Sequence, residues 1–263
     1  MSAGAEPQLS PEYSICITDY NNASTARKTL DSIVNQIDGT FEVVVVDSVS
    51  SDGTREILRE YSERQIIKLT EVKCTRGRGR QKAFESSSGK YVISNVDLDN
   101  PLKPNLIQLM CTYHQVCDGS LLFALSPTVK NAWGPAGISI IPRALVQRLG
   151  GWRNVQIFED TDLFARASQL GMYRWGWFDI LQSANDRSDW PWVKRLRYRY
   201  ATHRDWLRLG GKLKFGGGSP WGSALKLLAA IDSEFRTKYP NPYLETYKSM
   251  DSHYRVDLGA DEP

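Results

Sequence analysis

Two aspartates, Asp97 and Asp99, follow the apolar stretch Tyr91-Val92-Ile93 and precede Asn100-Pro101. In an extended segment, side chains two residues apart leave the same face about 6–7 Å from each other. Two carboxylates held that close repel each other unless a cation joins them. Such hard oxygen ligands suit Mg²⁺ or Mn²⁺ carrying a substrate's phosphates. The pair therefore predicts a divalent-metal site, although an Asp-x-Asp triplet also fits a solvated loop.

A second pair of acids, Glu159 and Asp160, begins a segment with helical spacing of apolar residues. A carboxylate that reaches a substrate hydroxyl can act as a general base. The alternative is that the acids only complement the helix dipole, which favours negative charge at a helix start.

The run Arg76-Gly77-Arg78-Gly79-Arg80 is the third chemical feature. It lacks the Gly-Lys-Ser/Thr ending of a P-loop. Guanidinium groups bind phosphate in a bidentate way, and glycines would let the backbone approach closely. An exposed basic loop explains the run equally well.

Length and composition limit the class of protein. The chain has 263 residues, of which 41% are hydrophobic and 24% charged, with a formal net charge of +3. This suffices for one large α/β domain, with or without an appendage. No apolar run approaches the ~18–20 residues of a membrane-spanning helix, and residues 1–11 lack the features of a secretory signal. The four cysteines have no metal-ligand spacing, and Cys16 fits core packing. We expect a cytoplasmic protein.

The elements that position these residues alternate between strand and helix. Alternation of this kind predicts a parallel sheet with right-handed crossovers, in which ligands bind beyond the carboxyl ends of the strands. Asp19, Asp47 and Asp97 all fall at such ends, so one crevice would collect all three. The expected strands are 13–18, 41–46, 66–69, 121–125, 138–141, 173–181 and one entering Asp97; the expected helices are one capped by Ser24 and 54–64, 81–87, 106–115, 143–149, 159–170 and 223–239.

The C-terminal part differs in composition. Residues 194–214 contain eight basic residues and one acidic residue, Asp205, interleaved with tyrosine and tryptophan. This pattern fits a peripheral helix on an anionic membrane surface, at the inner face of the membrane for a cytoplasmic protein. It also fits a binding site for a phosphate-bearing acceptor, or a charged face that is exposed to solvent. Nucleic acid is not favoured, because no recognised binding module is present.

Four blocks, taken in order, resemble the family 2 glycosyltransferases of the GT-A fold. The likeness covers about residues 13–180. The blocks are YSICITDYN (13–21), VVVVDSVSSDGT (43–54), RQKAFESSSGKY (80–91), and GGW (150–152) followed by FEDTDLFAR (158–166). The resemblance implies an α/β fold with a mostly parallel, Rossmann-like sheet flanked by helices. Beyond the region of the resemblance, composition and spacing predict a helical basic and aromatic C-terminal segment.

The resemblance also implies a binding site for a nucleotide diphosphate sugar. Thr18, Tyr20 and Asn21 would line the nucleotide base, and Asp47 would accept a hydrogen bond from it. Arg76 or Arg80 would lie near the diphosphate. The family more often uses UDP-sugars than GDP-sugars.

The chemistry is implied in the same way. Asp97 and Asp99 would hold a Mg²⁺ or Mn²⁺ ion that bridges the diphosphate, with Asp99 the more direct ligand. Asp160 would be the general base that deprotonates the acceptor hydroxyl, supported by Glu159. A single base placed for direct displacement implies an inverting reaction.

The sequence departs from the family pattern at several points. Asp19 stands where the family usually has proline, and Ser48 where a second aspartate often follows. The family often places a further polar metal ligand after the last strand of the core. Asn185 and Asp186 occupy that neighbourhood, while His203 comes later.

These observations predict three regions: a flexible N-terminus (1–12), a sugar-donor-binding and catalytic domain (13–184) and a helical extension (185–263) that contacts a carbohydrate or lipid-linked acceptor or the membrane surface. The expected activity is that of an inverting, metal-dependent glycosyltransferase. Two rivals remain open: a sugar-phosphate nucleotidyltransferase, and a non-catalytic module that binds lipid or polyanions through the basic tail.

Overall fold

The computed structural model describes residues 10–126, 137–182, 191–212, 220–242, 244 and 254–256. Within these residues, seven strands form one sheet in the order β3-β2-β1-β4-β6-β5-β7. The strands are β1 (Tyr13–Asp19), β2 (Phe41–Asp47), β3 (Lys68–Glu71), β4 (Tyr91–Val96), β5 (Leu122–Ser126), β6 (Ser139–Pro142) and β7 (Tyr173–Trp177).

The sheet is mostly parallel, as expected. Strands β1 to β4 pair in parallel, and so do β5 and β7. Strand β6 runs antiparallel to both of its neighbours, which the strand–helix alternation did not predict.

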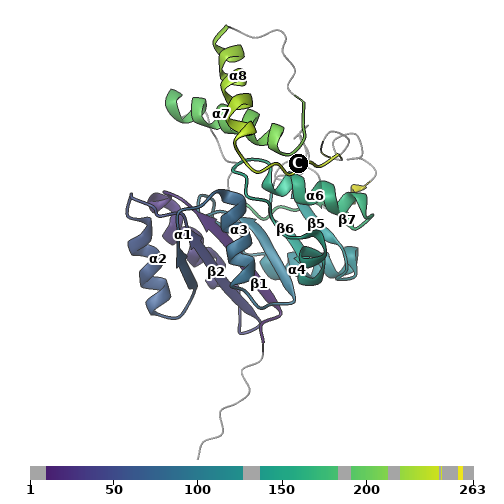
Figure 1. Cartoon of the computed structure of the whole chain (residues 1–263). Coiled ribbons are helices and arrows are strands. Elements are labelled where there is room, and N and C mark those ends of the chain that lie inside the picture. The colour runs from purple at the N-terminus through teal and green to yellow at the C-terminus, as the bar shows by residue number, and fades with distance from the viewer. Residues whose placement is uncertain are drawn as a thin grey trace, which may run out of the picture.

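Helices cover both faces of this sheet (Figure 1). The core on one face includes α1 (Ala23–Val34), α2 (Thr54–Glu63) and α4 (Leu106–Cys117). The core on the other face includes α3 (Arg76–Glu85), α5 (Arg143–Leu149) and α6 (Glu159–Gln169). Side chains alternate between these two cores along each strand because successive residues point to opposite faces.

Strand β1 shows this alternation. Ile15 and Ile17 enter the first core, and Cys16 enters the second, as expected for a buried structural thiol. The valines of β2 divide between the cores in the same way and are all buried, which explains why this strand is a continuous apolar run.

Helices α7 (Trp192–Arg208) and α8 (Pro220–Glu234) lie together to one side of this body (Figure 1). The carboxylate of Asp205 accepts hydrogen bonds from the backbone N–H groups of Gln156 (2.7 Å) and Ile157 (3.2 Å). Arg208 donates to the carbonyl of Asn154 at 2.9 Å. These contacts attach α7 to the loop that leads into α6. No helix in the described part of the chain is long and apolar enough to cross a membrane.

Several boundaries differ from the expectation. Helix α1 begins after Asn22, so Ser24 lies inside the helix and does not cap it. Helix α3 begins at Arg76, five residues before the expected start, because the Thr75 hydroxyl accepts a hydrogen bond from the Arg78 N–H and caps it. The arginine–glycine run is therefore helical. Strand β7 ends at Trp177, and α8 covers 220–234.

Candidate active site

Three acidic residues lie at the carboxyl ends of neighbouring strands. Asp19 ends β1 and pairs in register with Asp47, which ends β2. Asp97 directly follows β4, the other neighbour of β1. Burial raises the pKa of Asp19 to about 7, and the charges of Asp97, Asp47 and Asp52 add to the rise, against a hydrogen bond from Asn22. The structure thus brings the three carboxylates together as the strand pattern predicts.

The Asp47 carboxylate holds a turn in place. Its side chain is fully buried, and its two oxygens accept hydrogen bonds from the backbone N–H (2.9 Å) and the hydroxyl of Ser50. The Ser50 hydroxyl in turn accepts from the Asn21 N–H at 2.8 Å, and the Asn21 side chain accepts from the Ser51 N–H at 2.8 Å. These bonds lock the turn after β1 onto the turn after β2. These hydrogen bonds show that Asp47 fixes the conformation of the loop after β2. Its hydrogen bond with the nucleotide base stays a prediction.

The residues predicted to line the base differ in exposure. Tyr20 is 60% exposed, so its ring is available for stacking. Thr18 is buried beneath α3, where its hydroxyl oxygen has no hydrogen-bond partner in the described residues. A Cβ atom on Gly79 would lie 2.4 Å from the Thr18 methyl group. Thr18 therefore packs against α3, whereas Tyr20 and Asn21 are both exposed.

The guanidinium of Arg80 is the centre of the site. Arg80 is 1% exposed, which excludes the exposed basic loop that was one of the two interpretations of its run. Its Nη2 lies 3.1 Å from Asp160 Oδ2, 3.3 Å from Glu159 Oε1 and 3.9 Å from Asp97 Oδ1. It also donates a hydrogen bond to the side chain of Asn95. A buried cation needs such partners, and they come here from β4 and α6.

Asp160 is held from two sides. Its Oδ1 accepts a hydrogen bond from the indole N–H of Trp152 at 3.0 Å, and its Oδ2 pairs with Arg80. The carboxylate is nevertheless not fully enclosed, because its side chain remains 12% exposed. Such a group is oriented and still within reach of a substrate hydroxyl, as a general base requires.

Glu159 is more deeply buried than its neighbour, with 4% of its side chain exposed. Its Oε1 also lies 3.7 Å from Nε of Arg76. Burial raises the pKa of Glu159, and the charge of Asp160 raises it further, against the pull of Arg76 and Arg80. These contacts make Glu159 a buried counter-charge for two arginines.

The pair Asp97 and Asp99 lies in the turn after β4, and the Leu98 side chain between them is fully buried. Oδ1 of Asp97 is buried and makes no hydrogen bond within the described residues. Such an oxygen fits a cation. No group of three His, Cys, Asp or Glu side chains forms a metal cluster in the described ranges. Mg²⁺ often uses only one or two carboxylates and completes its shell with substrate phosphates and water, so two aspartates are compatible with it.

The candidate third ligands are not brought into the site by the described structure. Asn185 and Asp186 lie outside the described residues. His203 lies on α7, where burial lowers its pKa.

The glycines between the arginines serve packing. A Cβ atom on Gly77 would lie 2.1 Å from the carbonyl oxygen of Arg153. The Gly77 N–H donates to the Val155 carbonyl at 3.0 Å. Gly77 therefore allows α3 to pack closely against the loop before α6. This corrects the interpretation that the glycines let the backbone approach a phosphate.

Sequence reasoning missed three residues of this arrangement. Asn95 adopts a left-handed conformation (φ 65°) at an irregular point of β4, where it meets Arg80. Trp152 orients Asp160 through its indole N–H. Asp205, on α7, holds the loop before α6 through the backbone N–H of Gln156. Two local signals were present: Asn95 is a polar residue that interrupts an apolar strand, and Trp152 belongs to the GGW block, although neither was assigned a role in the site.

The sheet and its flanking helices have the GT-A fold of known glycosyltransferases. A mannosyltransferase from Pyrobaculum calidifontis, PcManGT, solved with GDP-Man and Mn²⁺, superimposes with a TM-score of 0.60 at 18% identity, covering 96% of this chain and 78% of that one. Staphylococcus aureus TarS (residues 1–349), solved with UDP-GlcNAc, gives a TM-score of 0.55 at 16% identity, covering 85% and 72%.

The sequence comparisons agree with this fold. Residues 14–135 match the model of glycosyl transferase family 2. The probable glycosyltransferase YdaM of Bacillus subtilis is 28% identical over 237 residues, which cover 76% of this chain and 56% of the relative. The chain thus spans little more than half the length of that relative. The matches support family 2 of the glycosyltransferases.

Proposed function

We propose that this protein transfers a sugar from a nucleotide diphosphate sugar to an acceptor hydroxyl or phosphate, with inversion at the sugar carbon. The observation that carries the proposal is the convergence on Arg80 of Asp97 from the end of β4 and Asp160 from α6, at 3.9 Å and 3.1 Å. In this proposal Asp97 lies on the side of the diphosphate and Asp160 deprotonates the acceptor, so the two functions would meet at one buried arginine.

The sugar donor would lie across the carboxyl edge of β1, β2 and β4. Tyr20 would stack on the base, and the locked turns around Asn21 and Asp47 would shape the pocket. The two solved structures were obtained with GDP-Man and UDP-GlcNAc, so the fold accommodates both nucleotides. For this chain we propose a UDP-sugar rather than a GDP-sugar as the donor, because the family uses UDP-sugars more often.

A divalent cation, Mg²⁺ or Mn²⁺, would be held by Asp97 and Asp99. Bound there, it would neutralise the charge that develops on the leaving diphosphate. Oδ1 of Asp97 is buried and makes no hydrogen bond within the described residues, which supports this assignment. The Arg76 side chain, 36% exposed beside Glu159, supplies further positive charge near the same place.

Asp160 would take the proton of the acceptor hydroxyl as that oxygen attacks the sugar. Trp152 and Arg80 fix the orientation of the carboxylate before the acceptor arrives. General-base catalysis of this kind typically contributes 10²–10⁴-fold. Glu159 would act indirectly, by holding Arg76 and Arg80 in place.

The position of this site suggests different roles for the two main regions of the chain. Residues 13–184 would bind the sugar donor and carry out the chemistry. Residues 185–263 would supply contacts to the acceptor or to a membrane surface, since α7 is attached to the loop just before Asp160.

The test is a thermal-shift panel of nucleotides and nucleotide sugars with and without Mn²⁺, followed by product analysis. A ligand that binds only the folded protein raises its stability by RT ln(1 + [L]/Kd), so the correct sugar donor stands out. The expected product is a free nucleoside diphosphate, and its release should be lost in Asp99→Ala and Asp160→Ala. Pyrophosphate released from a nucleoside triphosphate would instead identify a nucleotidyltransferase. Activity that survives both substitutions would overturn the catalytic assignment.

A further inference from the structure

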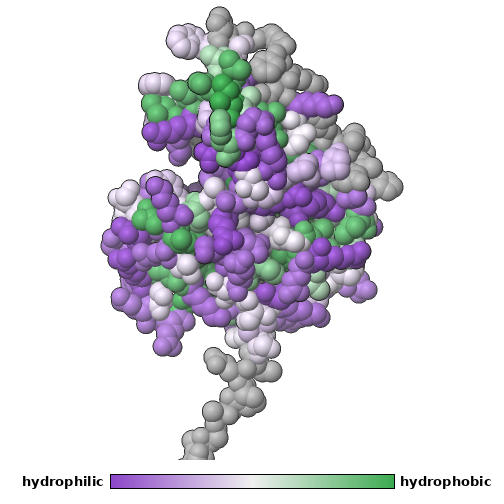
Figure 2. Space-filling view, in the orientation of Figure 1, coloured by the Kyte–Doolittle hydropathy of each residue, from purple (hydrophilic) through white to green (hydrophobic). Residues whose placement is uncertain are grey.

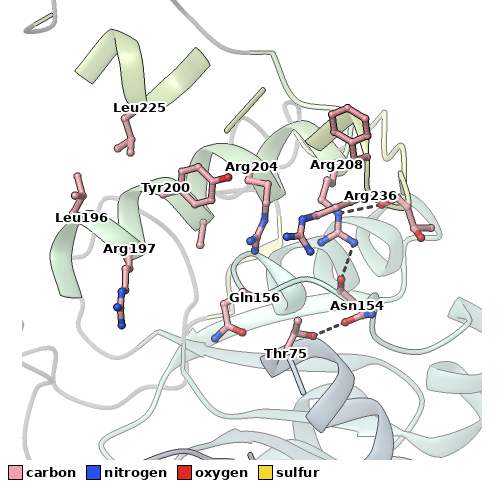
Figure 3. Close-up of a pocket in the computed structure, with 13 residues that line it drawn as sticks. Thr75, Asn154, Gln156, Leu196, Arg197, Tyr200, Arg204, Arg208, Leu225 and Arg236 are labelled. Atoms are coloured by element: carbon pink, nitrogen blue, oxygen red, sulfur yellow. Dashed lines mark hydrogen bonds between the residues drawn. The ribbon is translucent and has the colours of Figure 1, made fainter. Parts of the chain in front are cut away.

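A cleft of about 780 Å³ lies between α7, α8 and the loop before α6. Four arginines line it: Arg197, Arg204 and Arg208 from α7, and Arg236 beyond the end of α8. Figure 3 shows the α7 arginines projecting from one side of the helix toward the core. Figure 2 shows a hollow between α7 and the body of the molecule.

The cleft carries a surplus of positive charge. Asp205 pairs with Arg204 at 2.8 Å and with Arg208 at 3.2 Å, and Asp232 pairs with Arg236 at 3.0 Å. These two carboxylates thus pair with three of the four guanidinium groups that line the cleft. Arg197 forms no ion pair with any residue in the described part of the chain. The surplus favours an anionic ligand.

Another part of the cleft lining is apolar. Leu196, Tyr200, Leu225 and Phe235 contribute to the lining. Figure 3 places Leu196 and Leu225 between the two helices and away from the tips of the arginines. A ligand with a charged end next to an apolar part would contact both the arginines and these apolar side chains.

The floor of the cleft adjoins the candidate active site. Thr75 and Gln156 line the cleft, and Gln156 accepts a hydrogen bond from the backbone N–H of Arg76 at 3.2 Å. The Arg76 side chain then lies 3.7 Å from Glu159, next to the proposed base Asp160. A ligand held in the cleft would therefore extend toward the reacting groups.

We propose that this cleft binds a phosphate-bearing group of the acceptor, with Arg197 and Arg236 as its principal contacts. This assignment deepens the proposed function and rests on it. Guanidinium groups form bidentate, charge-assisted hydrogen bonds with phosphate oxygens, which a diffuse basic surface does not provide. The phosphate is an ester on a lipid or on a soluble molecule, and the chemistry of recognition is the same in both.

The test uses the full-length protein and two probes. One probe is inorganic phosphate, followed by thermal shift and titration. The other is a set of phosphatidylcholine vesicles containing one part in five phosphatidic acid, followed by flotation, with pure phosphatidylcholine as the blank. The variants are Arg197→Gln and Arg236→Gln. Arg195→Gln is the matched control, because Arg195 is exposed on the same helix and does not line the cleft.

We expect at least one probe to bind, and each cleft variant to weaken binding about tenfold or more, since a hydrogen bond to a charged group is worth at least that factor. Arg195→Gln should bind as the wild type does. Cleft-dependent binding of the vesicles indicates a lipid-borne phosphate, and binding of inorganic phosphate without binding of the vesicles indicates a soluble ester. Arg197→Lys should restore part of the affinity.

Two results would overturn the inference: neither probe binds, or Arg195→Gln weakens binding as much as Arg197→Gln, which would mean nonspecific attraction to the basic face. Nucleotide-sugar thermal shifts on the same samples separate this failure from failure of the proposed function. Sugar-donor binding without phosphate binding refutes only the cleft. Cleft-dependent phosphate binding without any sugar-donor binding refutes the acceptor role together with the proposed function.

Discussion

The guanidinium of Arg80, on α3, lies 3.1 Å from the carboxylate of Asp160, on α6. The same guanidinium lies 3.9 Å from Asp97. It therefore connects the proposed metal-binding aspartate with the proposed base. Displacement of either carboxylate changes the electrostatic surroundings of the other.

Arg80→Gln should destabilise the protein by about 3–5 kcal/mol, because it leaves buried carboxylates without their cation. It should also abolish transfer, since Asp160 loses one of its two anchors. Chemical denaturation and sugar-donor turnover measure the two effects. Arg78→Gln is the control: Arg78 lies on the same helix, its side chain is 46% exposed, and its 4.0 Å contact with Glu85 is worth little. Equal loss in both variants would refute the central role of Arg80.

Asp160→Asn should lower kcat by about 10²–10⁴-fold while the sugar donor binds as before, because only proton transfer is removed. Trp152→Phe should lower kcat less and shift its pH profile, because the indole N–H that orients the carboxylate is lost. Steady-state kinetics across pH distinguish the two. A Trp152→Phe enzyme with wild-type kcat and pH profile would show that the tryptophan only fills the core.

Asp97→Asn should remove the stabilisation that a nucleotide diphosphate gains from Mn²⁺, because the amide is a much weaker ligand for a hard cation. Without metal, the variant and the wild type should bind the nucleotide equally. Thermal shift with Mn²⁺ and with EDTA measures the difference. A wild-type response to Mn²⁺ in the variant would place the cation elsewhere.

Gly77→Ala should destabilise the protein by about 2 kcal/mol or more, although alanine is the better helix former. The new Cβ would lie 2.1 Å from the Arg153 carbonyl oxygen, so α3 would have to move off the loop before α6. Gly39→Ala is the control, because nothing lies within 4 Å of its Cβ position. Urea unfolding of both variants measures the cost. Equal effects would mean that the close approach is not required.

Asp19→Asn should stabilise the protein above about pH 7 and change little near pH 4. The pKa of Asp19 is raised from 3.8 to about 7 by burial, so its contribution is fully present below its unfolded value and is lost as pH rises through about 7. Since one pKa unit corresponds to about 1.4 kcal/mol, we expect a gain of about 1–4 kcal/mol near pH 8. Unfolding free energies measured across this range test the sign. A constant difference at all pH values would contradict the assignment.

The strand pattern was enough to predict where the acidic residues lie. The run of valines before Asp47 and the apolar residues before Asp97 identify buried strands, and a residue directly after a parallel strand must emerge at its carboxyl edge. The mostly parallel sheet and the meeting of Asp19 with Asp47 were predictable for this reason. The antiparallel β6 was not, because its apolar run is compatible with either direction.

The sequence by itself determined the α/β class of the fold, the position of three carboxylates at one edge of the sheet and the basic, aromatic character of the C-terminal helices. Only the tertiary structure decided that Arg80 is buried between Asp97 and Asp160, that Gly77 is a packing contact and that Asp205 joins α7 to the loop before α6. The reason is separation along the chain: Arg80 and Glu159 are 79 residues apart, and Gln156 and Asp205 are 49 apart. Local periodicity reports which face of an element is buried, whereas the partner on that face is set by how distant elements pack.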